Sequence, residues 1–482
     1  MAHTSQQLDI HAAFRGKDSL NIIAGAGTGK TTTIVQGEMY LPSTTLFLAF
    51  NKSIADELKV RMPHRNCKTF HAIALSNLQQ RVGKRNVDAY KYTKLAEQVG
   101  YSREEGTWMS DAISLFQLSS DGVYTNSFDW TLEFFMDVCG PELDLLDVPE
   151  GTSLSKYDLA DAALRLLCIE TENPTAWTFD DMLFFVAYYA RTKKWFMQDY
   201  DCIVVDEAQD VSPIRLDILK RLTKRCIAVG DPKQAIYKFA GAMTDAMQSI
   251  KDAFKSRDLP LSVTWRCDKA IIEEAAHIVG PYLEPRPNAG EGQITYIEVQ
   301  TLFNSRLTED TMVLCRTNVP LLKLALKLLA NRSPFNLISD YPGKLCKRAD
   351  KLAKGVKGMA AFRTVVHEFF EDKLAKTKSD AIKARITDER DAIYVVADIC
   401  QKPEDVSKKF EELMRCKTGP ILTTGHKAKG LEAGRAILIR PDLTPAPWVD
   451  QEDEEEMQQE LNLKYVMITR AKREFVYAEG DF

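Results

Sequence analysis

The chain has 482 residues, a formal net charge of −5 at pH 7, 45% hydrophobic residues and 27% charged residues. This is the composition of an ordinary globular protein, and at about 100–200 residues per domain the length predicts three or four domains. No apolar run approaches the ~20 residues of a membrane-spanning helix, which excludes an integral membrane protein of helical type. The net charge gives no overall attraction to a polyanion, so any nucleic-acid site must be a local groove.

The N-terminus and the cysteines indicate the compartment. The first seven residues lack the basic start and the apolar core of a secretory signal. Ten cysteines are spread along the chain without a Cys-x-x-Cys pair, and Cys202, Cys226 and Cys315 fall in predicted buried strands. We therefore expect an intracellular protein in a reducing compartment, cytoplasmic if the source is a bacterium or phage and nuclear if it is a eukaryote.

A helix is predicted from residue 4 onwards, with Leu8, Ala12 and Ala13 on its inner face. The side-chain amide of Gln7 offers a donor and an acceptor together, which matches the N6 and N7 edge of adenine. The alternative for a single glutamine here is a solvent-facing helix residue.

An apolar strand at residues 20–24 runs into a glycine-rich turn and then into a threonine-rich helix start. Glycines let backbone N–H groups approach phosphate oxygens closely, and the N-terminus of a helix carries partial positive charge. The sequence therefore predicts a nucleotide phosphate loop, in which Lys30 reaches the β- and γ-phosphates and the Thr31 hydroxyl binds Mg²⁺. Ala24 stands where the strict pattern has glycine, a position that needs only a small residue. The alternative is a glycine-rich turn that closes an ordinary β–α unit.

Two further predicted strands end in polar and aromatic residues, and ligands bind at the carboxyl ends of strands in a parallel sheet. These strands are predicted at residues 44–52 and 68–73. Phe70 and His71 are predicted to stack on unpaired bases, and Asn51 and Lys52 to hold phosphates. The alternative is that these four are packing or surface groups.

Residues 80–179 show helical periodicity with many charges and no strong strand, which predicts an inserted helical subdomain. A second chemical site follows it, where a buried strand at residues 202–205 ends in Asp206 and Glu207. One carboxylate can hold Mg²⁺ through water, while the next orients and deprotonates the water that attacks the γ-phosphate. The alternative for two acids after a strand is a solvated turn.

The next predicted strand begins at residue 226 and is followed by polar and aromatic residues. Gln234 is placed there to sense the γ-phosphate, while Tyr237 and Phe239 offer faces for stacking on bases. This strand is therefore predicted to couple nucleotide to nucleic acid.

Beyond residue 260 a second α/β pattern begins, and it encloses a helical, lysine-rich segment at residues 341–417. Its strands are predicted at residues 261–266, 311–316, 419–424 and 435–440. The lysines of the helical segment predict a solvated helix face, with a DNA groove as the alternative.

Seven blocks in order carry a resemblance: AGAGTGKT, TFHAI, VVDEAQD, GDPKQAIYKFAGA, TWRC, TTGHKAKGLE and YVMITRAK. From residue 7 to residue 472 the chain resembles superfamily 1A helicases of the UvrD/Rep type, and the form of the GDPKQAIYKFAGA block is similar to the F-box helicase branch, without an F-box. The resemblance implies an α/β fold of two RecA-like parallel-sheet motor domains with ATP between them, each with an inserted, mainly helical subdomain. The expected boundaries are 1–79 and 180–260 for motor domain 1A, 80–179 for insertion 1B, 261–340 and 418–482 for motor domain 2A, and 341–417 for a reduced insertion 2B.

The resemblance also implies roles for residues. Gln7 would read adenine, Trp265 would stack on it where the family usually has Tyr, and Glu432 would contact the ribose. Arg266 and Arg470 would reach the γ-phosphate, since the arginine fork stays charged and stabilises equatorial oxygens in the transition state. The expected catalytic residues are Lys30, Glu207, Gln234, Arg266 and Arg470. The other expected nucleotide contacts are Ala24, Gly25, Ala26, Gly27, Thr28, Gly29, Thr31 and Thr32; the Mg²⁺ ligands are Thr31 and Asp206; and the DNA contacts are Asn51, Lys52, Phe70, His71, Tyr237, Phe239, Thr424 and His426.

The departures from the family pattern fall mainly on the DNA side. Phe239 stands where Trp is common and Ala240 where Arg is common, which implies a weaker grip on one base. The second insertion is small for the family, and the chain ends 12 residues after Arg470. We therefore expect neither a regulatory rotation of that insertion nor a following nuclease domain.

The leading hypothesis is an ATP- and Mg²⁺-dependent motor that moves 3′ to 5′ on single-stranded DNA and unwinds duplexes in replication, repair or recombination. One rival uses ATP to displace recombinase or other proteins from single-stranded DNA and unwinds little. Another is an ATP-gated binding module, against which Glu207, Gln234 and Arg470 argue because a clamp needs no hydrolytic base. The expected partners are single-stranded DNA, partial duplex DNA and recombination or replication proteins, with no membrane.

Overall fold

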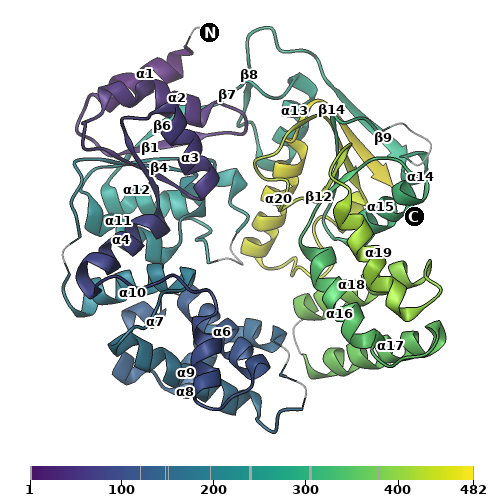
Figure 1. Ribbon diagram of the computed structural model, residues 1–482. Helices are drawn as coiled ribbons and strands as arrows, with labels where there is room; N and C mark the ends of the chain where they lie inside the picture. The colour runs from purple at the N-terminus through teal and green to yellow at the C-terminus, as the bar shows by residue number, and fades with distance from the viewer. Residues whose placement is uncertain are drawn as a thin grey trace. The chain divides into compact units, whose positions relative to one another are not determined.

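The computed structural model describes residues 3–119, 121–146, 148–149, 151–195, 197–237, 241–302, 307–377 and 380–480. The chain divides into two compact units. Unit 1 comprises Met1–Ala24 and Gly29–Leu261, and unit 2 comprises Gly25–Thr28 and Ser262–Phe482. Figure 1 shows that each unit has its own sheet with its own helices.

Unit 1 is built on a six-stranded sheet with strand order β3-β2-β4-β5-β1-β6, in which every adjacent pair is parallel. Parallel strands need crossover connections and are buried on both faces, so they consist of nearly continuous apolar runs. The strands are β1 (Leu20–Ala24), β2 (Leu46–Ala49), β3 (Asn66–Thr69), β4 (Ile203–Asp206), β5 (Cys226–Gly230) and β6 (Arg257–Leu261).

The helices of unit 1 include seven α-helices that lie between β3 and β4 among the described residues, α4 to α10, and α5 to α9 are here called the helical series. The α-helices are α1 (Ser5–Phe14), α2 (Lys30–Gly37), α3 (Lys52–Arg61), α4 (Phe70–Val82), α5 (Lys91–Gln98), α6 (Arg103–Leu118), α7 (Asp121–Tyr124), α8 (Leu132–Cys139), α9 (Lys156–Glu172), α10 (Phe179–Thr192), α11 (Pro213–Leu222) and α12 (Ala246–Phe254). Short 3₁₀ helices are η1 (Glu38–Tyr40), η2 (Ser127–Asp129), η3 (Gly140–Leu145), η4 (Ala208–Asp210) and η5 (Pro232–Gln234).

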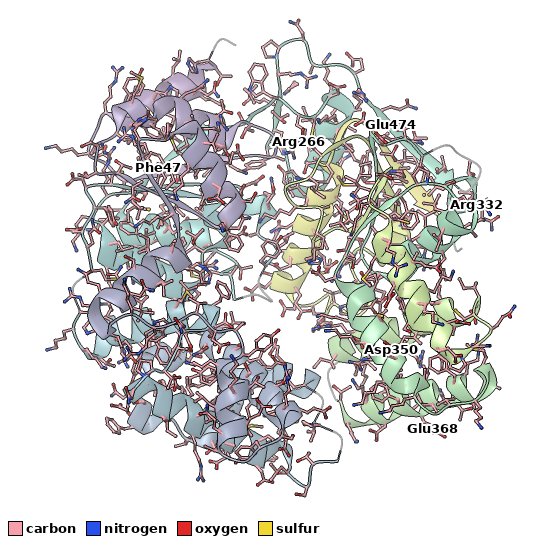
Figure 2. The ribbon with its side chains drawn as sticks, in the orientation of Figure 1. Phe47, Arg266, Arg332, Asp350, Glu368 and Glu474 are labelled. Carbon is pink, nitrogen blue, oxygen red and sulfur yellow. The ribbon has the colours of Figure 1, made fainter. Side chains whose placement is uncertain are left out.

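The two faces of this sheet pack against different helices, because successive side chains of a strand point to opposite sides. Leu46 and Leu48 of β2 belong to one core cluster, whereas Phe47 and Ala49 belong to the other. Phe47, labelled in Figure 2, lies in the cluster that contains α1, α2 and α3. Residues of α4, α10, α11 and α12 fill the cluster on the opposite face.

The helical series α5 to α9 shares the core of the sheet rather than forming a separate one. Phe116 of α6, Phe135 of α8 and Leu167 of α9 belong to the same buried cluster as Leu46 and Leu48 of β2. A contiguous apolar core indicates that these helices and the sheet pack as one body.

Unit 2 is built on a second six-stranded parallel sheet, with strand order β11-β12-β10-β13-β14-β9 and a separate pair of short strands. Its strands are β7 (Val263–Thr264), β8 (Glu284–Pro285), β9 (Gln293–Glu298), β10 (Thr311–Cys315), β11 (Asn336–Ile338), β12 (Ile421–Thr424), β13 (Ala433–Ile439) and β14 (Ala471–Glu479). Its helices are α13 (Lys269–Val279), α14 (Val299–Leu302), α15 (Val319–Ala330), α16 (Tyr341–Ala353), α17 (Met359–Lys376), α18 (Asp380–Ala397), α19 (Pro403–Arg415), α20 (Glu454–Ile468) and the 3₁₀ helix η7 (Pro441–Leu443).

The predicted α/β fold with two parallel sheets is confirmed, but two predicted strands have other limits. The strand predicted at residues 68–73 ends at Thr69. Phe70 instead begins α4, because the Thr69 hydroxyl oxygen accepts a hydrogen bond from the Ala72 N–H (3.2 Å) and caps the helix. The strand predicted at residues 261–266 is divided between Leu261, which ends β6 in unit 1, and the two-residue strand β7 in unit 2.

All ten cysteines are free thiols, and Cys202, Cys226 and Cys315 are fully buried, as predicted. Burial raises the pKa of Cys202 and of Cys315 to about 11, so both thiols stay uncharged at neutral pH. In the described part of the chain, no helix is both long enough and apolar enough to cross a membrane.

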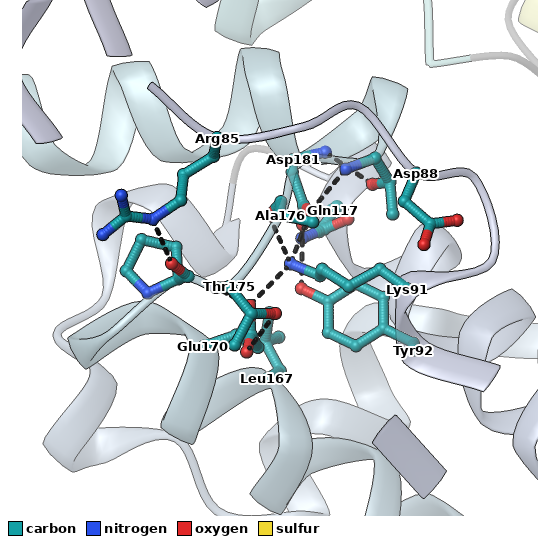
Figure 3. Close-up of polar contacts among 12 residues, drawn as sticks. Arg85, Asp88, Lys91, Tyr92, Gln117, Leu167, Glu170, Thr175, Ala176 and Asp181 are labelled. Carbon is teal, nitrogen blue, oxygen red and sulfur yellow. Dashed lines mark hydrogen bonds and ion pairs between the residues drawn. The ribbon is translucent and has the colours of Figure 1, made fainter. Parts of the chain in front are cut away.

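Lys91 joins α5 and α9, the first and last helices of the helical series, to α10 through a buried ion cluster (Figure 3). Its ammonium lies 2.6 Å from one carboxylate oxygen of Asp181 in α10 and 3.0 Å from Glu170 in α9, and all three side chains are at most 2% exposed. Tyr92 of α5 and Gln117 of α6 each donate a 2.8 Å hydrogen bond to the other oxygen of Asp181. The cluster therefore joins four helices.

The chain segments that enter and leave the helical series run side by side next to this cluster. The Trp177 N–H donates to the Asn86 carbonyl and the Asp88 N–H donates to the Trp177 carbonyl, both at 2.9 Å. Asp181 also accepts a 2.7 Å hydrogen bond from the Thr178 N–H and so caps α10. The helical series is thereby fixed to α10, which packs on the sheet.

Replacing Lys91 with Met should destabilise unit 1 strongly, because Glu170 and Asp181 would keep two buried carboxylates without their cation. Breaking a buried ion pair from one side costs ~3–5 kcal/mol. The measurement is urea unfolding followed by tryptophan fluorescence. Lys94→Met is the matched control on the same helix, since its pair with Asp88 leaves the lysine 58% exposed and contributes ~1 kcal/mol or less. Equal losses in the free energy of unfolding of the two variants would contradict a stabilising role of the buried ion cluster.

Candidate nucleotide and nucleic-acid site

The predicted phosphate loop connects β1 to α2. Gly27 and Gly29 have φ angles of +72° and +81°, a backbone conformation that favours glycine, and Gly29 forms the N-cap of α2. The Thr28 hydroxyl donates a 2.9 Å hydrogen bond to the Gly25 carbonyl and closes the turn. Ala24 is fully buried at the end of β1, so a small apolar residue fits the place where the strict pattern has glycine.

Four predicted residues meet at the end of this loop. The Lys30 ammonium lies 3.6 Å from a carboxylate oxygen of Glu207, and the Thr31 hydroxyl donates a 3.3 Å hydrogen bond to Asp206. Lys30 and Thr31 begin α2, whereas Asp206 ends β4 and Glu207 follows it. Residues far apart in the sequence thus converge at the carboxyl edge of one sheet, where a ligand is expected.

The charges at this point fit a bound dication. Asp206 is 3% exposed; burial raises its pKa to about 7, the charge of Glu207 adds to the shift, and Lys30 opposes it. One buried carboxylate, one threonine hydroxyl and the oxygens of a phosphate chain are the donors that Mg²⁺ prefers. Among the described residues no group of three or more His, Cys, Asp or Glu side chains is placed to hold a metal ion.

Glu207 is held in a strained and well-defined position. Its φ angle is +54°, a left-handed conformation that is costly for a residue with a side chain and that occurs preferentially at functional sites. The Gln209 amide donates a 2.6 Å hydrogen bond to the Glu207 carboxylate. The other side of the Gln209 amide accepts a 3.0 Å hydrogen bond from the Asp231 N–H.

The same network reaches Gln234. Its amide donates a 2.7 Å hydrogen bond to the Asp231 carboxylate, and Gln234 is 5% exposed. A Cβ at Gly230 would lie 2.4 Å from the Gln209 oxygen, so a larger residue there would displace the Gln209 amide. Gln209 and Asp231 were not predicted as functional residues, although both lie inside the quoted motif blocks.

Gln7 is buried rather than solvent-facing, with 6% of its surface exposed. Its amide donates to the Thr33 hydroxyl (3.1 Å) and accepts from the Thr4 N–H (3.1 Å), so it links α1 to α2. Thr32, the next loop residue in the expected set, accepts a 3.3 Å hydrogen bond from Arg61.

In unit 2, three of the predicted nucleotide residues lie close together. Arg266, labelled in Figure 2, donates from Nε to Glu432 (2.8 Å) and from Nη1 to the Thr469 carbonyl (3.1 Å). Lys472 pairs with the other Glu432 oxygen at 2.7 Å. Trp265, which precedes Arg266, is 36% exposed and so has part of its indole surface open.

Arg470 is 1% exposed and its guanidinium is held inside unit 2. It donates to the Val466 carbonyl (2.9 Å), the Leu431 carbonyl (3.0 Å) and the Thr469 hydroxyl (3.3 Å). In this conformation the predicted arginine finger therefore also supports the fold of unit 2.

The predicted phosphate contacts of the DNA face lie at the start of α3. Asn51 caps this helix by accepting a 2.9 Å hydrogen bond from the Ile54 N–H, and both Asn51 and Lys52 are exposed. A helix N-terminus with an adjacent lysine suits a phosphate group.

The predicted stacking residues differ in exposure. Phe70 is 3% exposed and packs in the core, so its ring face is covered in this conformation. His71 is partly buried, and burial lowers its pKa to about 4, with the charge of Arg215 adding to the shift. Tyr237 lies parallel to Phe50, with ring centroids 6.3 Å apart and an interplanar angle of 4°. Phe239 lies outside the described residues.

An exposed aromatic side chain on this face was not predicted. Phe179, the first residue of α10, is 58% exposed and meets the His71 ring edge-on at 6.1 Å. The signal in the sequence was an aromatic residue directly after the helix-capping Thr178. An exposed ring held beside a histidine offers a further face for stacking on a base.

The two predicted DNA contacts of unit 2 lie after β12. Thr424 ends that strand and is 8% exposed. Burial lowers the pKa of His426 to about 3, and the nearby charge of Arg316 adds to the shift. His426 is therefore neutral at physiological pH.

Known proteins match this chain over most of its length. Residues 4–255 match the family model described as the UvrD/REP helicase N-terminal domain. The chain is 26% identical over 522 residues to F-box DNA helicase 1 of Gallus gallus, an alignment that covers 98% of this chain and 48% of the relative. It is 23% identical over 510 residues to F-box DNA helicase protein 1 of Schizosaccharomyces pombe, covering 98% and 57%, and 25% identical over 326 residues to DNA helicase IV of Escherichia coli, covering 56% and 46%.

The chain thus spans about half the length of these curated relatives. The family model covers more than half of the chain and includes both the phosphate loop and the Asp206–Glu207 pair. The chain belongs to the UvrD/Rep helicase family.

Proposed function

We propose that this chain is an ATP- and Mg²⁺-dependent translocase on single-stranded DNA that unwinds partial duplexes with 3′ to 5′ polarity. One observation carries the proposal: Lys30 and Thr31 of the phosphate loop meet Glu207 and Asp206 at 3.6 Å and 3.3 Å. A loop that holds phosphates next to a positioned carboxylate base is built for hydrolysis and not only for binding. The matched relatives are named as DNA helicases, which supports DNA as the track.

The roles of the residues in unit 1 follow from their contacts. Lys30 would bind the β- and γ-phosphates, and Thr31 with Asp206 would hold Mg²⁺, which supplies charge neutralisation on the phosphate oxygens when it is bound. Glu207 would accept the proton of the attacking water, since the Gln209 amide fixes one carboxylate oxygen and its backbone conformation fixes the side-chain direction. Gln234 would respond to the γ-phosphate through Asp231.

The DNA would bind along the carboxyl edge of the unit 1 sheet. Asn51 and Lys52 would hold phosphates, whereas His71, Tyr237 and the exposed Phe179 would contact bases. Stacking of this kind tolerates any sequence, because every base has a face.

The division into subdomains remains part of the proposal. A unit boundary at Leu261 and two runs of consecutive α-helices in the described residues, α5 to α9 and α16 to α19, support it. The proposed parts are 1–79 and 180–260 (1A), 80–179 (1B), 261–340 and 418–482 (2A), and 341–417 (2B).

We also propose an intracellular role in replication, repair or recombination, with proteins of those processes as partners. In the alternative, the same ATP-driven movement along single-stranded DNA would displace a bound recombinase instead of separating a duplex. Strand separation on a naked fork, compared with release of a bound protein from single-stranded DNA, distinguishes the two.

Changing Glu207 to Gln should abolish ATP turnover and leave ATP binding nearly intact, because the amide keeps the shape but cannot accept a proton. The expected loss is at least ~100-fold, the lower end of general-base effects. The measurement is the steady-state ATPase rate beside nucleotide affinity, with the exposed Glu57→Gln of α3 as the control. A variant that keeps more than about a tenth of the rate would remove Glu207 from the role of base.

Changing Arg470 to Lys should slow hydrolysis while sparing ATP affinity, because an arginine finger acts chiefly on the transition state. The expected loss is ~10³-fold or more by analogy with other arginine fingers. Lysine is preferred to alanine here because it keeps a donor for the carbonyls that Arg470 binds inside unit 2. The ATPase rate, ATP affinity and melting temperature are measured together. A rate loss matched by an equal loss of affinity would make Arg470 a ground-state ligand.

Two partial duplexes that differ only in tail polarity test the direction. We expect unwinding of the duplex with a 3′ single-stranded tail, little unwinding of the 5′-tailed one, and little dependence on tail sequence because the contacts are to base faces and phosphates. The measurement is fluorescence of a displaced labelled strand with ATP and Mg²⁺ present. Preferential unwinding of the 5′-tailed duplex would overturn the proposed polarity.

A further inference from the structure

Arg215 of α11 packs against two aromatic side chains beside the proposed DNA face. Its guanidinium carbon lies 4.6 Å from the ring centroid of Phe50, which follows β2, and 5.8 Å from that of Phe70, which begins α4. Phe50 in turn stacks in parallel on Tyr237, which follows η5. Segments that follow three different strands therefore meet at this arginine.

The same side chain is tied to the loop that carries the proposed catalytic base. Arg215 Nη1 donates a 3.1 Å hydrogen bond to the Asp210 carbonyl. The Asp210 N–H donates to the Glu207 carbonyl at 3.0 Å, so one short turn separates Arg215 from the base. Movement of this turn during the ATPase cycle would move the guanidinium, and with it the rings that pack against it.

The surroundings of Arg215 suit ring packing better than a contact with a DNA phosphate. Its Nε is buried and has no hydrogen-bond partner among the described residues, and its guanidinium carbon lies over aromatic rings. Two rings lie within cation–π range of the side chain, and its Nη1 is occupied by Asp210. A guanidinium can stack on rings and donate in its plane at the same time, which an ammonium group cannot do.

We propose that Arg215 is a positioning residue that couples the nucleotide site to the grip on single-stranded DNA. It links the turn after Glu207 to the buried Phe70 and to the Phe50–Tyr237 pair, and so sets the orientation of Tyr237, the member of this group that is proposed to contact a base. This inference rests on the proposed function. The inference adds to the proposed function a path, through Arg215, by which ATP hydrolysis at Glu207 would change the stacking of aromatic rings on DNA bases.

The test compares Arg215→Met and Arg215→Lys with the unaltered chain. Arg221→Met is the matched control, because Arg221 lies on the same helix and pairs with Asp217. For each variant we measure the basal ATPase rate, the maximal DNA-stimulated rate, the DNA concentration for half-stimulation and the melting temperature. DNA is supplied as a single strand and as an abasic strand of equal length, which has phosphates but no bases.

We expect Arg215→Met to need about 2- to 30-fold more base-bearing DNA for half-stimulation, the effect of losing cation–π contacts worth ~0.5–2 kcal/mol. The response to abasic DNA should not change, so the preference for base-bearing DNA shrinks. Arg215→Lys should fall between Met and the unaltered chain, because it keeps the cation and loses the fork. Arg221→Met should keep the DNA responses of the unaltered chain.

Each other outcome has a definite meaning. Equal weakening on base-bearing and abasic strands would make Arg215 a phosphate contact and overturn the inference. A basal rate and melting temperature that fall together in both variants would make its role structural and also overturn it. No change in any DNA response would do the same. If the unaltered chain itself shows no stimulation by DNA, the proposed function fails, and this result is separate from any effect of Arg215.

Discussion

The charge balance at the end of β4 is the constraint on which the rest of unit 1 depends. Asp206 is buried beside Glu207, so two carboxylates face the single ammonium of Lys30, and burial raises the pKa of Asp206 to about 7. A dication bound at this edge would offset the negative charge of the carboxylates. Only a parallel sheet, whose carboxyl ends share one edge, brings Lys30 after β1 to the acids after β4, with β5 between them. The order of the strands is thus part of the chemistry.

Hydrogen bonds extend from that edge in two directions. One path runs from Glu207 through Gln209 and Asp231 to Gln234, and every step is a direct contact of 3.0 Å or less. The other path runs through the turn after Glu207 to the Asp210 carbonyl and Arg215. Both begin at the residue with the left-handed backbone, so a change in its surroundings would reach Gln234 and Arg215 together.

Features that depend on short sequence motifs could be predicted, whereas features that depend on contacts between residues remote in sequence could not. The phosphate loop, the acid pair and most strands could be predicted because each is a local pattern of residue types. Burial of Gln7 depends on Thr33, 26 positions away, and the role of Gln209 depends on Asp231, 22 positions away. Phe70 was placed in a strand because Thr and Phe favour strands, but a capping hydroxyl begins a helix there. Strands β9, β11 and β14 were not predicted, since polar residues interrupt them and their parallel neighbours are remote in sequence.

Helix α10 connects the helical series to the sheet of unit 1 and to the proposed DNA face. Its N-terminus contains Asp181, which both caps the helix and pairs with Lys91 in the buried cluster, and it begins with Phe179, which meets His71 on the proposed DNA face. The ion cluster fixes the helical series to this N-terminus, and a single apolar core fixes α10 to the sheet. A displacement of the helical series would therefore be transmitted to the sheet edge through packed side chains and a buried ion pair. Since Phe179 lies in the same helical turn as Asp181, its position relative to His71 depends on the buried Lys91–Asp181 pair.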